Sequence, residues 1–264
     1  MRYIAGLPAA ALGTLGRAAE ATVRHAAGLF HLVGRTARVI VTGKVALREI
    51  TAQIYSVGVQ SLPLVLVTAT LSGIVTSQQG GYQFTGSVPL YILASVVVAS
   101  IVLELGPVLT AVVIIGRVGA RITAEVGTMQ VSEQIDAMHS LGRDPVPVLA
   151  APRIIAGVVS MPVLVGIADL VGCTAGMVAA RSTLGLGYES FLYGARIFWH
   201  DWDLFYSVLK AATFGFIIPV IAVHMGFLTQ GGAEGVGRST TASVVFMIIA
   251  VLVLDALFPP LLLN

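Results

Sequence analysis

Charged residues are scarce in this sequence: Asp, Glu, Lys and Arg make up only 11% of its 264 residues, whereas 56% are hydrophobic. A soluble domain carries about 25% charged residues, because its surface must be solvated by water. The low charge therefore excludes an ordinary water-soluble protein and indicates that lipid surrounds most of the chain. The 29 glycines agree with this interpretation, since glycine lets membrane helices pack closely.

Motifs for catalysis and metal binding are also missing. The single cysteine, Cys173, lies in an apolar run, which excludes an intrachain disulfide and indicates a small packing residue. The histidines are scattered with no pair at i, i+4, and no phosphate-binding G-x-x-x-x-G-K-[ST] loop occurs. No basic block interleaved with aromatics points to nucleic acid. We therefore expect no cofactor, catalytic residue or metal in this chain, and any ATP and magnesium would bind to a separate subunit.

Long apolar segments predict five membrane spans. No charged residue occurs between Glu49 and Glu104, which leaves room for two helices of about 20 residues separated by a polar, glycine-rich turn. The stretch 181–203, with Trp199 and Trp202, is typical of an interfacial loop with a short helix. The predicted spans are about 54–77, 88–116, 154–180, 206–228 and 241–262. We expect an all-α polytopic membrane protein, with an N-terminal interfacial segment over 1–50 and a five-helix membrane domain over 51–264.

The N-terminal segment has basic or titratable residues at intervals of seven, namely Arg17, Arg24, His31 and Arg38. This spacing predicts an amphipathic helix over about 15–38. The helix either lies on an anionic inner leaflet or packs against the protein's own cytoplasmic surface, and the sequence leaves both open.

A second amphipathic helix is predicted over 128–141, between spans two and three. Its apolar residues are Val131, Ile135, Met138 and Leu141, and its polar face holds Glu133, Asp136 and Ser140. Gly142 can end the helix in a left-handed turn, and Asp144 with Pro145 cannot continue it. The helix is too short and too polar to cross a bilayer, so we expect it at a membrane face with its acidic side toward a soluble partner.

The distribution of basic residues predicts the orientation. With the N-terminus in the cytoplasm, the inner segments hold Arg2, Arg17, Arg24, Arg35, Arg38, Lys44, Arg48, Arg117, Arg121, Arg143, Arg153 and Arg238, and the outer segments hold only Arg181, Arg196 and Lys210. By the positive-inside rule, helix 128–141 is cytoplasmic and the C-terminus is periplasmic. An odd number of spans without an internal repeat cannot form a symmetric pore alone, so a homodimer is expected.

Three acids fall inside predicted spans: Glu104, Asp169 and Asp255. An acid that faces lipid costs about 2.5 to 3.5 kcal/mol, so these residues should face protein or a wet cavity. Glu104 either lines a cavity or packs, and Gly106 and Pro107 should open the helix beside it. Asp169 and Asp255 are expected to clamp helices together. Because no Lys or Arg is expected at the same depth, an internal ion pair is not expected.

Small residues recur every four positions in span three, at Ala168, Gly172, Gly176 and Ala180. This pattern predicts a close-packed seam between helices, within one chain or between two copies. Arg117 and Arg121 are expected to anchor the end of span two at the inner headgroups.

The stretch 104–157 resembles the MlaE/YrbE family of ABC-transporter permeases. The residues that carry the resemblance are Glu104-Leu-Gly-Pro-Val, Gly116-Arg-Val-Gly, Ala124-Glu-Val-Gly-Thr-Met, Glu133-Gln-Ile-Asp-Ala-Met, Leu141-Gly, Asp144-Pro, Pro152-Arg and Ala156-Gly. Weaker similarity extends over about 45–260. Several bacterial members have Arg before the Glu-Leu-Gly-Pro run, where this chain has Leu103.

The resemblance implies a homodimeric permease in the bacterial inner membrane that moves phospholipid or a related lipid between the inner and outer membranes of a Gram-negative-type envelope. The expected partners are a cytoplasmic ABC ATPase resembling MlaF, a periplasmic MCE-domain protein resembling MlaD and, in some systems, a STAS-domain subunit resembling MlaB. Candidate lipid-pocket residues are Glu104, Leu103, Pro107, Leu71 and Ile74. On this model helix 128–141 is a coupling helix, and the candidate ATPase-docking residues are Glu133, Asp136, Gln130, Met129 and His139.

Two other functions fit parts of the sequence. A proton-coupled carrier would use the intramembrane acids as relays, but it does not need a docking helix with an acidic face. A structural membrane scaffold would explain the glycine seam, but it gives Glu104 no role.

Overall fold

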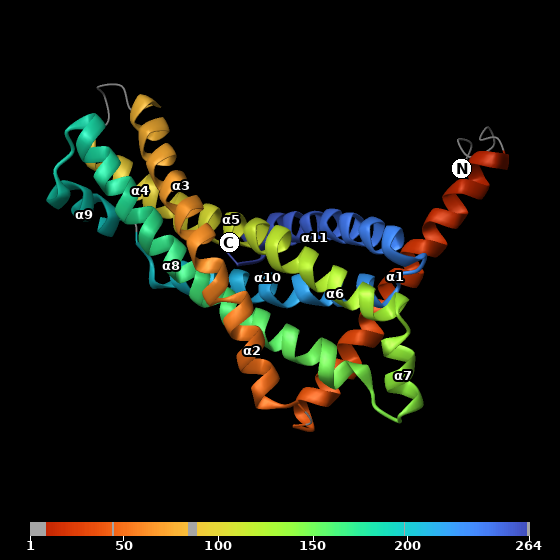
Figure 1. Ribbon diagram of the computed structural model, residues 1–264. Helices are drawn as coiled ribbons and strands as arrows, with labels where there is room; N and C mark the ends of the chain where they lie inside the picture. The colour runs from red at the N-terminus through yellow and green to blue at the C-terminus, as the bar shows by residue number, and fades with distance from the viewer. Residues whose placement is uncertain (1–8, 44, 84–88, 198, 263–264) are drawn as a thin grey trace.

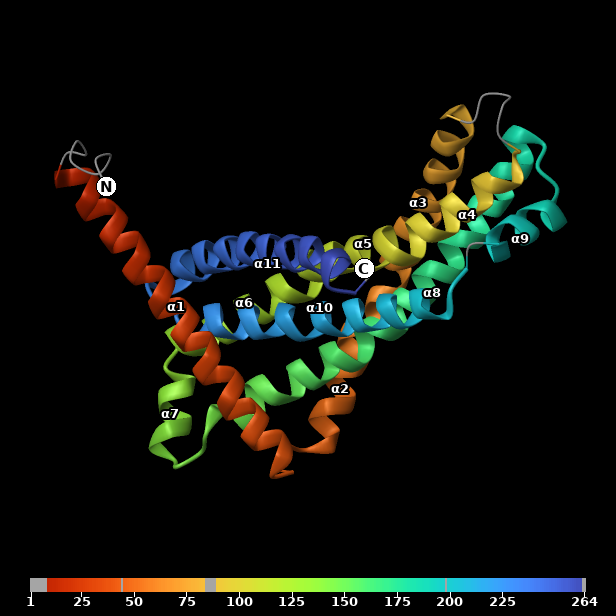
Figure 2. The same ribbon diagram turned by 180° about the vertical axis from the view of Figure 1, so that it is seen from behind.

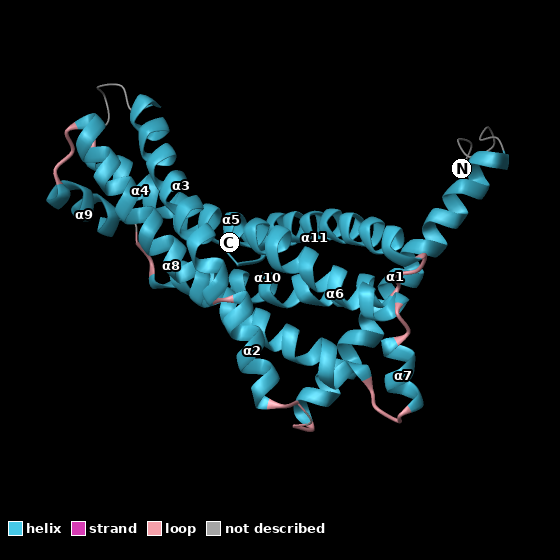
Figure 3. Cartoon of the chain, viewed as in Figure 1, coloured by secondary structure: helices cyan, strands magenta, loops and turns pink. Residues whose placement is uncertain are grey.

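The computed structural model describes residues 9–43, 45–83, 89–197 and 199–262, and within these ranges all regular structure is helical (Figure 3). The α-helices are α1 Ala9–Val41, α2 Leu47–Val57, α3 Leu62–Gln83, α4 Tyr91–Ser100, α5 Gly106–Ile114, α6 Ala120–Val131, α7 Gln134–Ser140, α8 Ala151–Leu184, α9 Tyr188–Ile197, α10 Asp201–Phe227 and α11 Gly232–Leu262. One 3₁₀ turn, η1 Val59–Ser61, and three π turns, η2 Ile101–Leu105, η3 Ile115–Gly119 and η4 Val146–Ala150, join them.

Five continuous helical segments are long and apolar enough to cross a membrane. They are Leu47–Gln83, Tyr91–Val131, Val146–Leu184, Asp201–Phe227 and Gly232–Leu262. The fold class predicted from the sequence, a helical protein with five spans, is therefore confirmed. The helices extend beyond the predicted boundaries, and part of the predicted turn between spans one and two, 84–88, lies outside the described residues.

The helices gather into two groups (Figures 1 and 2). Helices α3, α4 and α9 lie together around one end of α8, whereas α6, α10 and α11 pack against one another on the other side of the molecule. Thr123 of α6 joins the second group, because its buried hydroxyl lies 3.1 Å from the Ala222 carbonyl of α10 and 2.8 Å from the Ser243 hydroxyl of α11. The predicted loop 181–203 contains α9, which packs on α4 with the Tyr91 and Tyr193 rings 5.6 Å apart.

The glycine seam packs α8 against α3 of the same chain. A methyl group on Gly73 of α3 would overlap the carbonyl oxygen of Gly172, and one on Gly176 would lie 3.1 Å from the Gly73 carbonyl oxygen. The two backbones can approach this closely because none of these glycines carries a side chain. The seam therefore stabilises the monomer at this position.

Arg117 and Arg121 bind protein. The Arg117 guanidinium donates to the Ser56 carbonyl at 3.1 Å, to the Ser61 hydroxyl at 2.7 Å and to the Gln60 side chain at 3.2 Å. Arg121 donates to the Ser56 hydroxyl. Both arginines were expected to anchor the span at the lipid headgroups. In the structure they bind the junction of α2 and α3, where η1 interrupts the first span.

Helix α1 forms as predicted and runs longer than expected. Leu32 and Val39 are buried in the hydrophobic core, and Gly28 lies against the His224 ring of α10. The second half of α1 therefore packs on the protein, while His31 and Arg38 are exposed. The side chains of Arg17 and Arg24 lie outside the described part of the chain.

Candidate functional site

A lysine lies between two of the intramembrane acids. Lys210 of α10 is fully buried, and its Nζ forms ion pairs with Glu104 of η2 and, at 2.5 Å, with Asp255 of α11. The Tyr206 ring lies 5.4 Å from Nζ and adds a cation–π contact. Three elements that are far apart in the sequence thus meet at one charged cluster inside the membrane domain.

The backbone around Glu104 supplies a further ligand for Lys210. Pro107 has no N–H, so the donor that would normally reach the Leu103 carbonyl, four residues earlier, is missing. Lys210 Nζ donates to this carbonyl at 3.0 Å. The π turn η2 precedes Gly106, whose N–H donates to the Ile101 carbonyl five residues back. Gly106 and Pro107 were expected to open the helix, and the π turn with its free carbonyl is the form this opening takes.

The expectation of no internal ion pair was wrong. Lys210 was counted with the outer segments although the predicted span 206–228 includes it; α10 begins at Asp201 and places Lys210 well inside the span. The Leu103 side chain carries no charge, but the Leu103 carbonyl accepts a hydrogen bond from the cationic amine of Lys210 on α10. Among the acids, Glu104 has 47% of its side chain exposed and Asp255 only 17%, so Glu104 is the member of the cluster that a ligand can reach.

Asp169 is separate from this cluster. It lies on α8, is 7% exposed, and accepts a hydrogen bond from the Ser207 hydroxyl of α10 at 3.1 Å. Its second oxygen, Oδ1, has no hydrogen-bond partner among the described residues and abuts Gly106, where a methyl group would collide with it. Asp169 thus joins α8 to α10 through Ser207 and touches the helix that carries Glu104.

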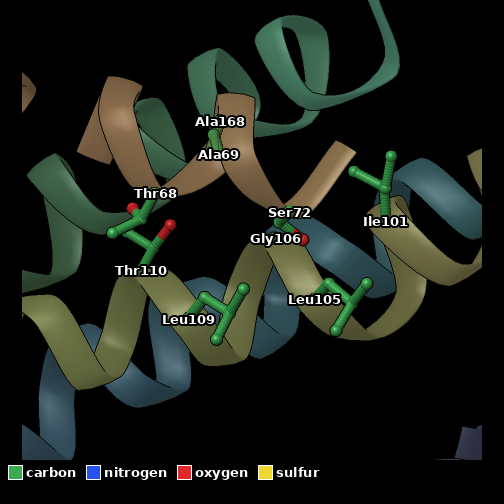
Figure 4. A pocket seen from close by; sticks show the side chains of 9 residues that line it. All are labelled: Thr68, Ala69, Ser72, Ile101, Leu105, Gly106, Leu109, Thr110 and Ala168. Atoms are coloured by element: carbon green, nitrogen blue, oxygen red, sulfur yellow. The ribbon is translucent and has the colours of Figure 1, made fainter. Parts of the chain in front are cut away.

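A narrow cleft beside this contact separates α3 from η2 and α5 (Figure 4). It is lined by Thr68, Ala69, Ser72, Ile101, Leu105, Gly106, Leu109, Thr110 and Ala168. Its volume of about 10 Å³ is close to the minimum for one water molecule, so one chain in this conformation has no room for a lipid there.

In the part of the chain that the structure describes, the candidate lipid-pocket residues are not gathered around one cavity. Leu103 and Glu104 are half-buried on η2, and Pro107 is buried. Leu71 is 57% exposed on the outer face of α3, and Ile74 lines a different cavity, between α3 and α8. A pocket that combines Glu104 with Leu71 would need walls from outside this chain.

The sequence matches the family model described as Permease MlaE over residues 50–260. It is 38% identical over 224 residues to a probable ABC transporter permease protein of Synechocystis sp., with 85% of each chain covered. A probable ABC transporter permease protein of Rickettsia prowazekii is also 38% identical, over 80% of this chain and 82% of its own. The chain belongs to the MlaE permease family.

A further relative is the chloroplastic protein TRIGALACTOSYLDIACYLGLYCEROL 1 of Arabidopsis thaliana, 34% identical over 85% of this chain and 64% of its own length. Membership makes the protein an ABC-transporter permease, and such a permease works with an ATPase. The family assignment also decides against the proton-coupled carrier that the intramembrane acids allowed.

The predicted coupling helix of this MlaE permease is two helices. Helix α6 ends at Val131, Glu133 adopts a left-handed conformation with φ of 59°, and α7 begins at Gln134. Gly142, with φ of 69°, ends α7 as predicted, since the Arg143 N–H donates to the Met138 carbonyl. The prediction of one helix over 128–141 was wrong, because Ser132 and Glu133 form a turn that periodicity alone does not reveal.

Acidic residues of this region do point outward. Glu133, Asp136 and His139 are exposed, whereas Ile135 is buried. Gln130 and Met129 are half-buried at the end of α6, and Met129 packs against the core. Leu141 was expected on the buried face and is 78% exposed, because α7 ends at Ser140 and Leu141 follows its last turn.

Two arginines hold this region to the rest of the chain. Arg35 of α1 binds Asp144 at 2.7 Å, and Asp144 accepts the Val146 N–H at 3.0 Å. Partial burial acts to raise the pKa of the Asp144 carboxyl, but these hydrogen bonds and the Arg35 charge outweigh it and lower that pKa below its ordinary value. Arg153, 3% exposed, donates to the Glu125 carboxylate at 2.7 Å and to the Leu149 carbonyl at 2.6 Å.

Proposed function

We propose that this protein is the permease subunit of an ABC transporter that moves phospholipid or a related lipid between the inner and outer membranes. The observation that carries the proposal is the match to the MlaE permease model over residues 50–260. The name of the Arabidopsis relative contains that of a galactolipid, which supports a lipid substrate.

Two copies of the chain would form the transporter. The lipid would lie between them, with its headgroup near Glu104 and its acyl chains against apolar side chains such as Leu71. The half-exposed Glu104 carboxylate supports this placement, because an acid in a membrane needs a polar or protein-lined surrounding. The small cleft of Figure 4 supports it as well, since it leaves no room for a lipid beside Gly106 within one chain.

A cytoplasmic ATPase resembling MlaF would dock on α7 through Glu133 and Asp136, which are exposed. A periplasmic MCE-domain protein and a STAS-domain subunit are further proposed partners, and ATP and magnesium would bind to the ATPase. The protein would lie in the bacterial inner membrane with its N-terminus in the cytoplasm. The burial of Lys210 within α10 supports this orientation, because only Arg181 and Arg196 then remain among the outer basic residues.

Lipid extraction tests the proposal. The complex is purified with its ATPase, and mass spectrometry identifies the lipids that it retains. In reconstituted vesicles, Glu104→Leu should lower ATP-dependent lipid movement about tenfold, the loss expected for one charged contact. Assembly should persist, because Asp255 still neutralises Lys210. Normal lipid movement by Glu104→Leu would remove the residue from the pathway, and a complex without any retained lipid would contradict the substrate class.

A further inference from the structure

The charged cluster inside the membrane domain holds more acid than base. Lys210 of α10 forms ion pairs with Glu104 and Asp255. Within the predicted spans, Lys210 is the only lysine or arginine. With one positive and two negative groups, the cluster of Lys210, Glu104 and Asp255 carries a net charge of −1 when both acids are ionised. The cluster therefore lacks one positive charge.

Hydrogen-bond donors are also scarce at this level of the membrane domain. Glu104 binds Lys210 through Oε2, and its other oxygen, Oε1, has no hydrogen-bond partner among the described residues. Asp169 is joined to α10 through Ser207, three residues before Lys210, and its Oδ1 likewise lacks a donor in the described part of the chain. An acceptor that is withdrawn from water and left without a donor is costly. A ligand that brings a positively charged donor to Glu104 would remove both deficits there.

The exposure of the three side chains decides which charge a ligand meets. The Lys210 side chain is 0% exposed and that of Asp255 is 17% exposed, whereas 47% of the Glu104 side chain is exposed. Leu103, the residue before Glu104, is half-buried and adds no charge. A ligand at this surface therefore contacts the Glu104 carboxylate, while the amine of Lys210 is out of its reach.

This surface distinguishes lipids by the charge of the headgroup. Every phospholipid carries an anionic phosphate, and ethanolamine or choline adds a cationic amine to it, whereas glycerol adds no positive charge. Opposite charges attract and like charges repel strongly where water is excluded. The amine would restore the positive charge that the cluster lacks, but a phosphate alone would add a second negative charge to it. Repulsion of the wrong headgroup thus contributes to selectivity as much as attraction of the right one.

We propose that Glu104 selects lipids whose headgroup carries a cationic amine, by binding this amine through its free oxygen, and that it disfavours lipids with a net negative headgroup. Lys210 is a positioning residue in this arrangement, because it holds the other oxygen of the carboxylate. This inference rests on the proposed lipid transport and adds the headgroup class to it.

Competition between lipids tests this inference. The complex with its ATPase is incorporated into vesicles that contain equal amounts of phosphatidylethanolamine, phosphatidylcholine and phosphatidylglycerol with the same acyl chains. After extraction in detergent, mass spectrometry measures the ratio of the lipids that the complex retains. The two lipids with an amine should each be enriched about tenfold over phosphatidylglycerol, the factor expected for one charged contact. The ratio does not depend on the yield of folded protein, because it compares lipids held by the same complex.

Four variants assign the preference to the charge of Glu104. Glu104→Gln keeps the shape but removes the charge, so the enrichment should fall about tenfold, to the ratio in the vesicles. Glu104→Asp keeps the charge and should retain most of the preference. Leu103→Arg adds a cation beside the carboxylate and should raise the share of phosphatidylglycerol about tenfold. Glu189→Gln is the matched control, because Glu189 is exposed on α9, outside the cluster, and its loss should leave the ratio unchanged.

The outcomes separate this inference from the proposed lipid transport. If the wild-type complex retains the three lipids equally, or if the preference survives in Glu104→Gln, selection by Glu104 is wrong while lipid transport stands. An unchanged ratio in Leu103→Arg would show that the headgroup lies elsewhere, which also overturns the inference. A complex that retains no lipid from any vesicle contradicts both proposals.

Discussion

Lys210 on α10 donates a hydrogen bond to the carbonyl of Leu103, which is free to accept it because Pro107 lacks an N–H. The same amine forms ion pairs with both Glu104 and Asp255. Pro107 thus leaves a backbone acceptor for a cation from another helix, and η2 is joined to α10 by an ion pair and by a hydrogen bond to its backbone.

Removal of the Lys210 charge should destabilise the protein strongly. Lys210→Met leaves Glu104 and Asp255 without a counter-charge and should lower the free energy of unfolding by about 3 to 5 kcal/mol, because breaking a buried ion pair leaves charge uncompensated. Thermal unfolding in detergent measures the change. The double variant Lys210→Met/Asp255→Leu should recover part of the loss, since it removes one of the stranded carboxylates. A Lys210→Met protein as stable as wild type would show that the ion pairs are not formed.

The close contact of α3 and α8 should not tolerate a methyl group. Gly73→Ala places a Cβ against the Gly172 carbonyl and should destabilise the protein by about 1 to 3 kcal/mol, the usual cost of overpacking. Gly237→Ala on α11 is the matched control, because it has open space and should leave the unfolding temperature unchanged or slightly higher. Equal unfolding temperatures of the two variants would show that α3 and α8 lie further apart than in this structure.

The turn between α6 and α7 should favour glycine. Glu133 has φ of 59°, which costs an ordinary residue about 1 kcal/mol, so Glu133→Gly should raise stability by up to this amount. Glu133→Val should lower stability, because a β-branched residue fits this conformation poorly. Thermal unfolding of Glu133→Gly, Glu133→Val and wild type in the same detergent measures both changes.

The same turn bears on the docking of the ATPase. Glu133→Lys combined with Asp136→Lys should abolish co-purification of the ATPase, because both charges on the exposed acidic face are reversed. The single exchange Asp136→Asn, which removes one charge, should only weaken it. Full ATPase binding by the double lysine variant would show that the ATPase docks on another surface of the protein.

The contact between Arg35 and Asp144 should depend on pH. The pKa of Asp144 is lowered in the folded protein, so its stabilising effect is complete above its ordinary value of 3.8 and is lost as the pH falls through the lower folded value. Both side chains are about two-fifths exposed, so the effect should stay below about 1 kcal/mol. The difference in unfolding temperature between wild type and Asp144→Asn should be complete at pH 7, decline below pH 3.8 and vanish only below the lower folded pKa. If the difference in unfolding temperature persists in acid, it arises from packing and not from the charge of Asp144.

Much of the architecture could be predicted from the sequence because it follows from length and composition. Apolar runs of about 20 residues and the change in hydropathy between them are enough to count spans. Small residues every four positions predicted the seam, but only the close approach of Gly73 to Gly172 assigns it to one chain. The break between α6 and α7 was missed for a similar reason, since Ser132 and Glu133 give no local signal for a left-handed turn.

The charged cluster was missed for a different reason. A lone lysine about ten residues into an apolar helix is indistinguishable from one that extends its side chain to the headgroups. The signal that could have found it was the pair of acids, Glu104 and Asp255, each of which needs a partner inside the membrane. Lys210 is the only lysine within the predicted spans. Its partners depend on the packing of α10 against η2 and α11, which no local pattern encodes.

The complete burial of Lys210 gives this protein a built-in reporter. The chain has one other lysine, Lys44, which lies outside the spans that contain the cluster. An amine-reactive reagent can acylate Lys210 only while α10 has separated from η2 and α11. The modification of one peptide, followed over time with and without ATP turnover in the partner, would therefore measure how often the interior of the permease opens.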